Sequence, residues 1–258
     1  MPKTIQSTIV ACKNHKIILS LLFVVQLIYL IIHFAVNVKY SLIIGQQFQT
    51  FVGLLQNANY DADLINAGTP FLNIGLFYSS YYTLIASVKR LLAYELLIFL
   101  SLGVALLTGT WLLFRTTTIK GGVVLYGQLL LRALLFVVPM YALISVLLDN
   151  SLTLASGAEP WFYVVIVLWL VLFYFMLVSL ALDGSFVQAV KRSFVLGIKK
   201  IPIILGTLLV IAAAVSGSGY LIYIALDMPL WILTLPILLL VCVLVIGRIF
   251  FMSIVRQA

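Results

Sequence analysis

The chain has 258 residues, of which 64% are hydrophobic and 9% are charged, and its mean hydropathy is +1.25. A soluble globular domain contains about 45–50% apolar and about 25% charged residues. This composition therefore excludes a soluble globular domain. The net charge of +8 does not indicate nucleic-acid binding, because the basic residues lie between hydrophobic runs rather than in one soluble patch. We therefore expect an integral membrane protein without a nucleic-acid partner.

Unbroken apolar runs predict an all-α fold, a polytopic bundle of six transmembrane helices. Each run is long enough for a membrane-spanning helix, which needs about twenty residues, whereas the strands of a membrane barrel alternate in polarity over about ten. The six predicted spans cover about residues 17–38, 91–114, 123–148, 161–182, 203–226 and 230–252.

Residues 39–90, between the first two spans, form a polar outer segment rich in Gln, Asn and Tyr. Within it, residues 71–86 are mildly apolar but contain Asn73, Ser79 and Ser80 together with several tyrosines. This composition is typical of an interfacial or re-entrant helix rather than of a lipid-facing span. We therefore predict that this piece does not cross the membrane, and we leave open which of the two kinds of helix it is.

Two ionisable residues, Glu95 and Arg132, lie inside the predicted second and third spans. A charge inside a membrane is costly, so each side chain should face the interior of the bundle and find a partner. We predict that they form an intramembrane polar pair. The pair could be a structural ion pair, or it could act as a proton relay, an ion relay or a gate; a relay normally needs a chain of acids, which favours the structural role.

Residues 185–201 predict an amphipathic helix between the fourth and fifth spans. At 3.6 residues per turn, Phe186, Val190, Phe194, Ile198 and Ile201 form one apolar stripe. Ser185 and Gln188 have the spacing of a capping box. Four cations lie on its other faces, namely Lys191, Arg192, Lys199 and Lys200.

These four cations have two interpretations. They could be topology signals only, as expected of loops on the inner side of a membrane, or they could bind anionic lipid headgroups at about 1 kcal/mol each. Because they accompany an apolar stripe, we predict that the helix lies in the plane of the membrane and contacts anionic lipid headgroups.

The fifth span contains a run of eight small residues, AAAVSGSG, from Ala212 to Gly219. Ala213 and Gly217 have the small-xxx-small spacing that lets helices pack closely. Alternatively, Ser216, Gly217 and Gly219 could break the helix and line a cavity, as in transporters. A second broken segment elsewhere would support transport, and the sequence has none, so helix packing is preferred.

The distribution of Lys and Arg predicts the orientation. With six spans and a cytoplasmic N-terminus, eleven basic residues lie inside and three outside, so both termini should be cytoplasmic by the positive-inside rule. Counting residues 71–88 as a seventh span would place most of the basic loops outside. The three outer basic residues are Lys39, Lys89 and Arg90.

The central segment, Met176–Leu205, carries a family resemblance. Its sequence is MLVSLALDGSFVQAVKRSFVLGIKKIPIIL, and it resembles the YciC family of six-span inner-membrane proteins of Gram-negative bacteria, with that family's alanine and serine at Ala189 and Ser193. The segments KNHKIILSLLF, LLQNANYDADLINAG and GRIFFMSIVRQA also match its layout. The chain is more distantly similar to the membrane domain beside some glycerophosphodiester phosphodiesterases. The resemblance implies an inner-membrane location and a six-span architecture, not an activity.

No feature of the sequence indicates catalysis, a cofactor or a bound metal. Cys12 and Cys242 provide neither a disulfide framework nor a metal site, and His15 and His33 should lie at opposite faces of the membrane. The common hydrolase, nucleotide-binding and redox motifs do not occur in the sequence.

We therefore expect a non-enzymatic inner-membrane protein that supports envelope or membrane organisation through lipid or protein contacts. The alternative is a permease or lipid-handling transporter, which would need an internal polar cavity around Glu95, Arg132 and Ser216.

Overall fold

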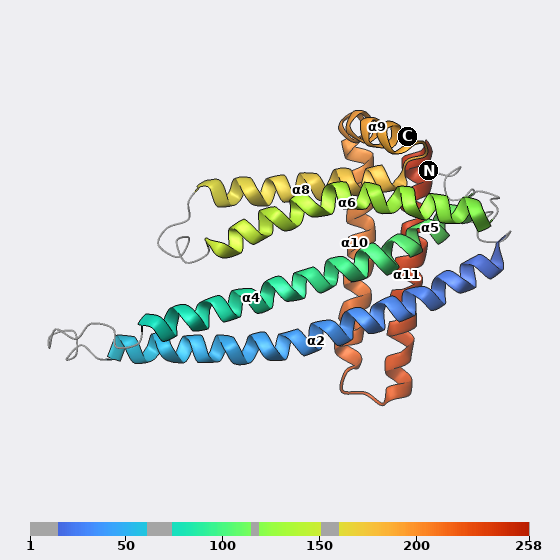
Figure 1. The fold of residues 1–258 in the computed structure, drawn as a ribbon. Helices are drawn as coiled ribbons and strands as arrows, with labels where there is room; N and C mark the ends of the chain where they lie inside the picture. The colour runs from blue at the N-terminus through green and yellow to red at the C-terminus, as the bar shows by residue number, and fades with distance from the viewer. Residues whose placement is uncertain (1–14, 61–73, 115–118, 151–159, 258) are drawn as a thin grey trace. The chain divides into compact units, whose positions relative to one another are not determined.

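The computed structural model describes residues 15–60, 74–114, 119–150 and 160–257, and no strand occurs in these ranges (Figure 1). The helices in chain order are α2 (Lys16–Tyr60), α4 (Ile74–Ile98), the π-helical turn η1 (Phe99–Gly103), α5 (Val104–Leu112), α6 (Ile119–Asp149), α8 (Pro160–Ala181), α9 (Phe186–Lys199), α10 (Ile201–Ala225) and α11 (Leu230–Gln257). Cys12 and Asn73, together with part of the outer segment 39–90, lie outside the described ranges.

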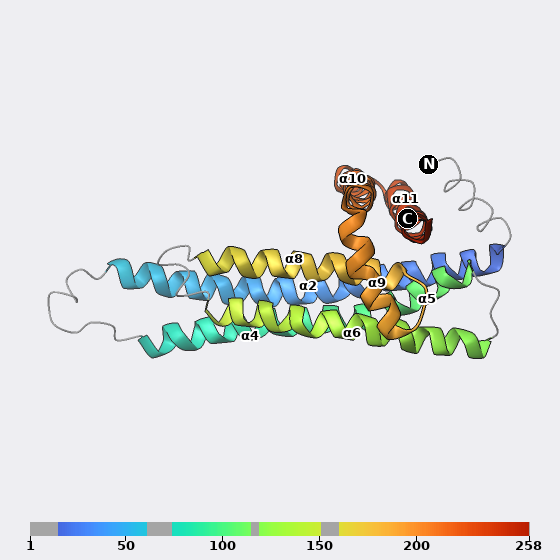
Figure 2. The same ribbon diagram turned by 90° about the horizontal axis from the view of Figure 1, so that it is seen from above.

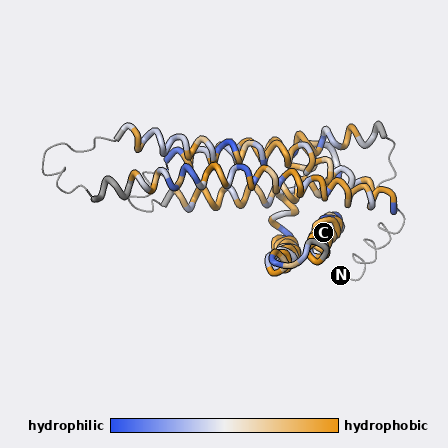
Figure 3. Tube along the Cα trace, turned by 90° about the horizontal axis from the view of Figure 1, so that it is seen from below, coloured by the Kyte–Doolittle hydropathy of each residue, from blue (hydrophilic) through white to orange (hydrophobic). Residues whose placement is uncertain are grey.

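Six helical segments are long and apolar enough to cross a membrane, which confirms the predicted fold class. One of them, Gly75–Leu112, runs without interruption through α4, η1 and α5. Hydrophobic residues predominate along the described helices (Figure 3). Pro139 and Pro236 lie inside α6 and α11, and both helices continue past them.

The first two helices extend well beyond the predicted spans. We predicted that the first span ends at Val38, but α2 continues to Tyr60, a length of 45 residues or about 67 Å at 1.5 Å per residue. Likewise, the described part of the piece at 71–86 is not a separate interfacial or re-entrant helix, because Ile74 begins a helix that continues into the second span. Polar composition predicted an end to the membrane-spanning run, but no proline interrupts either helix.

The chain divides into two compact units. Unit 2 comprises residues 31–98 and 141–165. In it, α2 and α4 run antiparallel and side by side (Figures 1 and 2), and the ring centroids of Phe51 and Phe77 are 5.0 Å apart. The hydroxyl of Tyr81 on α4 donates to the carbonyl of Leu148 at the end of α6 at 3.2 Å.

Unit 1 comprises residues 1–30, 99–140 and 166–258. Its described core brings together α2, α5 and α11 in one apolar cluster, formed by Leu22, Leu106, Leu113, Val245 and Ile249. The helices α10 and α11 form an antiparallel pair (Figures 1 and 2). A Cβ atom at Gly247 would lie 3.1 Å from Ile211 on α10, so the absence of a side chain there permits this close approach.

Candidate functional site: helix α9 and the turn that precedes it

The turn between α8 and α9 depends on one glycine. Gly184 has φ +123°, a conformation that side-chain-bearing residues rarely adopt. Ser185 then takes an extended conformation and ends the turn, and its carbonyl accepts the amide N–H of Ala189 at 2.9 Å. The predicted capping box is wrong in its detail, because the Ser185 side chain forms no capping hydrogen bond.

Helix α9 buries a face of small residues, and Gly197 on this face packs against α8. Ala189, Ser193 and Gly197 follow one another at intervals of four, and all three are buried. A Cβ atom at Gly197 would lie only 2.8 Å from the ring of Phe175, and the Tyr174 hydroxyl donates to the Gly197 carbonyl at 2.8 Å. Thus Gly197 lies where α9 needs minimal side-chain volume, on the same buried face as Ala189 and Ser193.

The outer side of α9 combines exposed apolar and cationic side chains. Val187, Phe194 and Ile198 are 68%, 43% and 62% exposed, respectively. Lys191 is seven positions before Ile198, hence on nearly the same side of the helix. We define the cationic edge of α9 as the six exposed residues Val187, Lys191, Arg192, Phe194, Ile198 and Lys199. The fourth predicted cation, Lys200, is half-buried at the C-terminal end of the helix.

Arg132 binds the backbone at the C-terminal end of α8. The side chain extends from α6 and is 1% exposed. Its Nη1 donates to the carbonyls of Ser179 at 3.1 Å and Leu182 at 2.7 Å, and Nη2 donates to the carbonyl of Gly184. The last carbonyls of a helix have no partner within it, so the guanidinium satisfies acceptors that burial would otherwise leave unpaired.

Two further side chains fix the same turn. The indole Nε1 of Trp111 on α5 donates to the Leu180 carbonyl at 3.0 Å. Arg256, near the end of α11, forms an ion pair with Asp183 at 3.3 Å, and its guanidinium carbon lies 5.1 Å from the ring centroids of both Trp111 and Phe114. We call Trp111, Arg132, Asp183 and Arg256 the anchoring junction, because they connect α5, α6 and α11 to the turn from which α9 starts.

The contacts of α9 and its anchoring junction define the candidate site without reference to any related protein. The chain matches no known protein family. No curated protein and no solved structure matches it either. The resemblance to the YciC family therefore stays a prediction, and the functional argument depends on the geometry of α9 and its anchoring junction.

The two members of the predicted intramembrane pair have different partners. Glu95 lies in unit 2, where its Oε2 is 2.5 Å from Nδ1 of His33 and its Oε1 accepts a hydrogen bond from Nδ2 of Asn37 at 2.7 Å. Arg132 lies in unit 1 and binds the carbonyls at the end of α8. Each residue thus has partners within its own unit, and the Glu95–Arg132 pair stays a prediction.

Sequence reasoning missed the partners that Glu95 does have. His33 and Asn37 are four residues apart, so they lie on one face of α2, and their spacing was the available signal. Asn37 also donates to the carbonyl of His33 at 2.9 Å, as expected for an i, i+4 pair. Trp111 and the Asp183–Arg256 ion pair were also missed, because residues so distant in sequence leave no local pattern.

The segment of small residues in the fifth span does not interrupt its helix. α10 runs unbroken from Ile201 to Ala225, so the discontinuous-helix interpretation is wrong. Ala213, Ser216, Gly217 and Gly219 are exposed, and in the described part of the chain no atom outside the helix lies within 4 Å of a Cβ built at either glycine. The helix-packing interpretation thus stays a prediction, and it would require a partner helix that the described residues do not supply at these positions.

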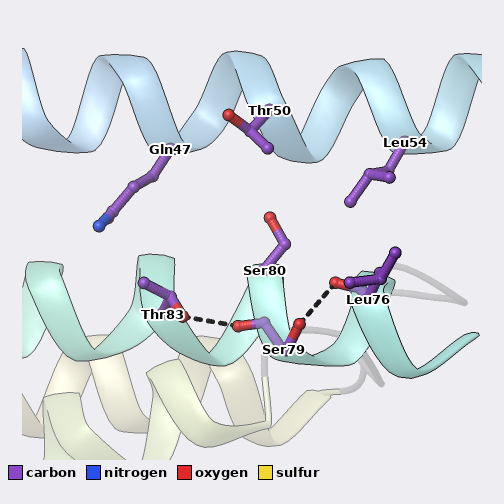
Figure 4. Close-up of a pocket in the computed structure, with 7 residues that line it drawn as sticks. All are labelled: Gln47, Thr50, Leu54, Leu76, Ser79, Ser80 and Thr83. Atoms are coloured by element: carbon purple, nitrogen blue, oxygen red, sulfur yellow. Dashed lines mark hydrogen bonds between the residues drawn. The ribbon is translucent and has the colours of Figure 1, made fainter. Parts of the chain in front are cut away.

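A groove in unit 2 offers little chemistry. It has a volume of about 430 Å³ and lies between α2 and α4 (Figure 4). Its hydroxyls bind mainly the backbone of their own helices, as Thr83 does to the Ser79 carbonyl at 2.7 Å and Ser79 to the Leu76 carbonyl at 2.9 Å. The lining contains no charged side chain; it consists of Gln47, Thr50, Leu54, Leu76, Ser79, Ser80 and Thr83.

Proposed function

We propose that this protein is a non-enzymatic inner-membrane protein that supports membrane organisation by contacting anionic lipid headgroups at the cytoplasmic face through α9. Six helices long enough to cross a bilayer support the membrane location. The resemblance to the YciC family and the excess of Lys and Arg in the predicted inner loops support the inner membrane and the cytoplasmic placement of both termini.

The observation that carries this proposal is the division of α9 into two faces. Its small residues are buried, whereas Val187, Phe194 and Ile198 remain exposed beside three exposed cations. Burying an exposed apolar side chain of this size contributes about 1.5–3 kcal/mol. Each cation adds about 1 kcal/mol near an anionic surface. An anionic membrane interface provides both contributions at once, which water does not.

The anchoring junction makes such a contact effective. Arg132 is 1% exposed and bonded to three carbonyls of one turn, and Trp111 and Arg256 bind the same turn from two other helices. A helix held in place in advance loses little conformational freedom when it binds, so less of the interaction free energy offsets ordering.

The transporter alternative has less support. It needs an internal polar cavity at Glu95, Arg132 and Ser216. Arg132 is engaged with backbone carbonyls, and Ser216 is exposed on an unbroken helix. These observations favour a role in contacts over a role in transport.

The test measures where α9 lies in vesicles of defined charge. Val195, which is exposed on α9, is replaced by cysteine in a Cys12→Ser/Cys242→Ala background and labelled with a polarity-sensitive fluorophore. We expect a blue-shifted emission in vesicles containing phosphatidylglycerol relative to phosphatidylcholine alone, because anionic lipid draws the cationic edge into the interface.

Two variants make the result specific. In the four-glutamine variant, with Lys191, Arg192, Lys199 and Lys200 each replaced by Gln, the difference between the two vesicle types should disappear. Replacing the exposed Lys39 and Arg90 of unit 2 by Gln should preserve it. Identical emission in both vesicle types for the labelled protein that keeps all four α9 cations would refute the proposed lipid contact.

A further inference from the structure

A second polar contact in unit 1 lies away from α9. Arg248 on α11 donates from Nη2 to the side-chain oxygen of Gln26 on α2 at 2.6 Å. Gln26 is 1% exposed. Leu22 lies one turn before Gln26, and Val245 and Ile249 lie next to Arg248 on α11, all within the apolar core cluster, against which Tyr29 also packs.

The other terminal nitrogen of this guanidinium, Nη1, is buried and has no hydrogen-bond partner in the described parts of the chain. Buried donors are nearly always satisfied, and an unpaired one on a charged group is especially unfavourable. Because Gln26 fixes the planar guanidinium through Nη2, Nη1 points in a defined direction.

No carboxylate in the described residues compensates the charge of Arg248. Glu95 pairs with His33, Asp149 with Lys89 and Asp183 with Arg256. The fourth described acid, Asp227, lies 21 residues earlier, about 30 Å along the axis of α11 from Arg248.

The position of Arg248 makes an uncompensated charge costly. It lies nine residues before Gln257, where α11 ends, which corresponds to about 13 Å along the helix. The predicted sixth span ends at about residue 252, so Arg248 lies about 6 Å from its inner end. A charged side chain inside a membrane span marks a functional site by default.

We propose that Arg248 and Gln26 form a binding site for an oxyanion, in which Nη1 donates to a phosphate or carboxylate oxygen while Nη2 stays on Gln26. Arginine suits this role because its planar fork stays charged and matches the oxygens of both groups. A phospholipid headgroup and a free phosphate present the same oxygens. This site is independent of the cationic edge of α9.

The experiment measures thermal unfolding of the full-length protein in a nonionic detergent at constant ionic strength. Phosphatidylglycerol, phosphatidylcholine or inorganic phosphate is added to the four-glutamine variant, so that α9 contributes no cations. At a hundredfold excess over the dissociation constant, we expect an anionic ligand to raise Tm by about 5–10 °C, and phosphatidylcholine to raise it much less. A shift with phosphatidylglycerol alone identifies a lipid site, and a shift with inorganic phosphate as well identifies a small-anion site.

Arg248→Gln should abolish the shift, whereas Arg90→Gln removes one exposed arginine of unit 2 and should preserve it. If Arg248→Gln does not fold, the double variant Gln26→Leu/Arg248→Met removes both polar partners together and leaves no unpaired buried group. An anion-dependent shift that persists in either folded variant, or no shift with either anion in the parent, overturns the proposal. These thermal shifts test the Arg248 site even if α9 proves not to bind lipid.

Discussion

Arg256 and Asp183 connect the end of α11 to the start of α9. Their charged atoms are 3.3 Å apart, and the two side chains are only 28% and 34% exposed. Through this ion pair the last described helix restrains the turn that positions the cationic edge. Arg256 also stacks on Trp111 and Phe114, so it connects three elements through one guanidinium.

Arg256→Gln should therefore loosen α9. We expect a loss of about 1 kcal/mol in unfolding free energy, because a partly exposed ion pair contributes up to about 1 kcal/mol and a cation–π contact a similar amount at most. The more specific readout is faster amide hydrogen exchange in residues 186–199. Lys89→Gln breaks the ion pair with Asp149 in unit 2 and should leave that exchange unchanged. Equal exchange rates in the wild type and Arg256→Gln would contradict the anchoring role.

Gly197→Ala should separate α9 from α8. The added Cβ would lie 2.8 Å from the Phe175 ring, and such overpacking typically costs about 1–3 kcal/mol. Gly206→Ala on α10 is the matched control, since nothing lies within 4 Å of its Cβ and alanine favours a helix over glycine by about 1 kcal/mol. Thermal unfolding should thus give opposite signs for the two variants. A Gly197→Ala protein as stable as the wild type would show that α9 does not pack closely on α8.

Arg132→Met should destabilise unit 1 more than any other single change described here. It removes the donor to the carbonyls of Ser179, Leu182 and Gly184, and leaving a buried acceptor such as the Leu182 carbonyl unpaired costs about 1–3 kcal/mol. Arg132→Lys keeps the charge but not the fork, so it should recover only part of the loss. Denaturation in mixed micelles measures both. Full stability of Arg132→Lys would mean that one donor suffices.

A double-mutant cycle distinguishes the two partner assignments for Glu95. Glu95→Gln and Asn37→Leu should couple by about 0.5–3 kcal/mol, because the two side chains share a hydrogen bond of 2.7 Å. Glu95→Gln and Arg132→Met should be additive, since each residue has its own partners. Strong coupling in the second cycle, with none in the first, would support the pair predicted from sequence.

The sequence alone determined the helices that can cross a membrane, because an unbroken apolar run of about twenty residues is a local property that needs no tertiary partner. It also indicated α9, whose period of 3.6 and flanking residues are local too. The sequence was less informative about where the helices end. Polar residues after Val38 suggested a boundary, yet a change of polarity does not stop a helix, and α2 continues to Tyr60.

Only the tertiary structure decided which partner each polar side chain takes and which face of α9 is buried. Glu95 binds His33 and Asn37, and Arg132 binds carbonyls of the α8–α9 turn, because hydrogen bonds depend on the positions of atoms far apart in sequence. On α9, the predicted stripe of large apolar residues is partly exposed. The buried positions are small, and at Gly197 the rings of Phe175 and Tyr174 approach too closely for a larger side chain.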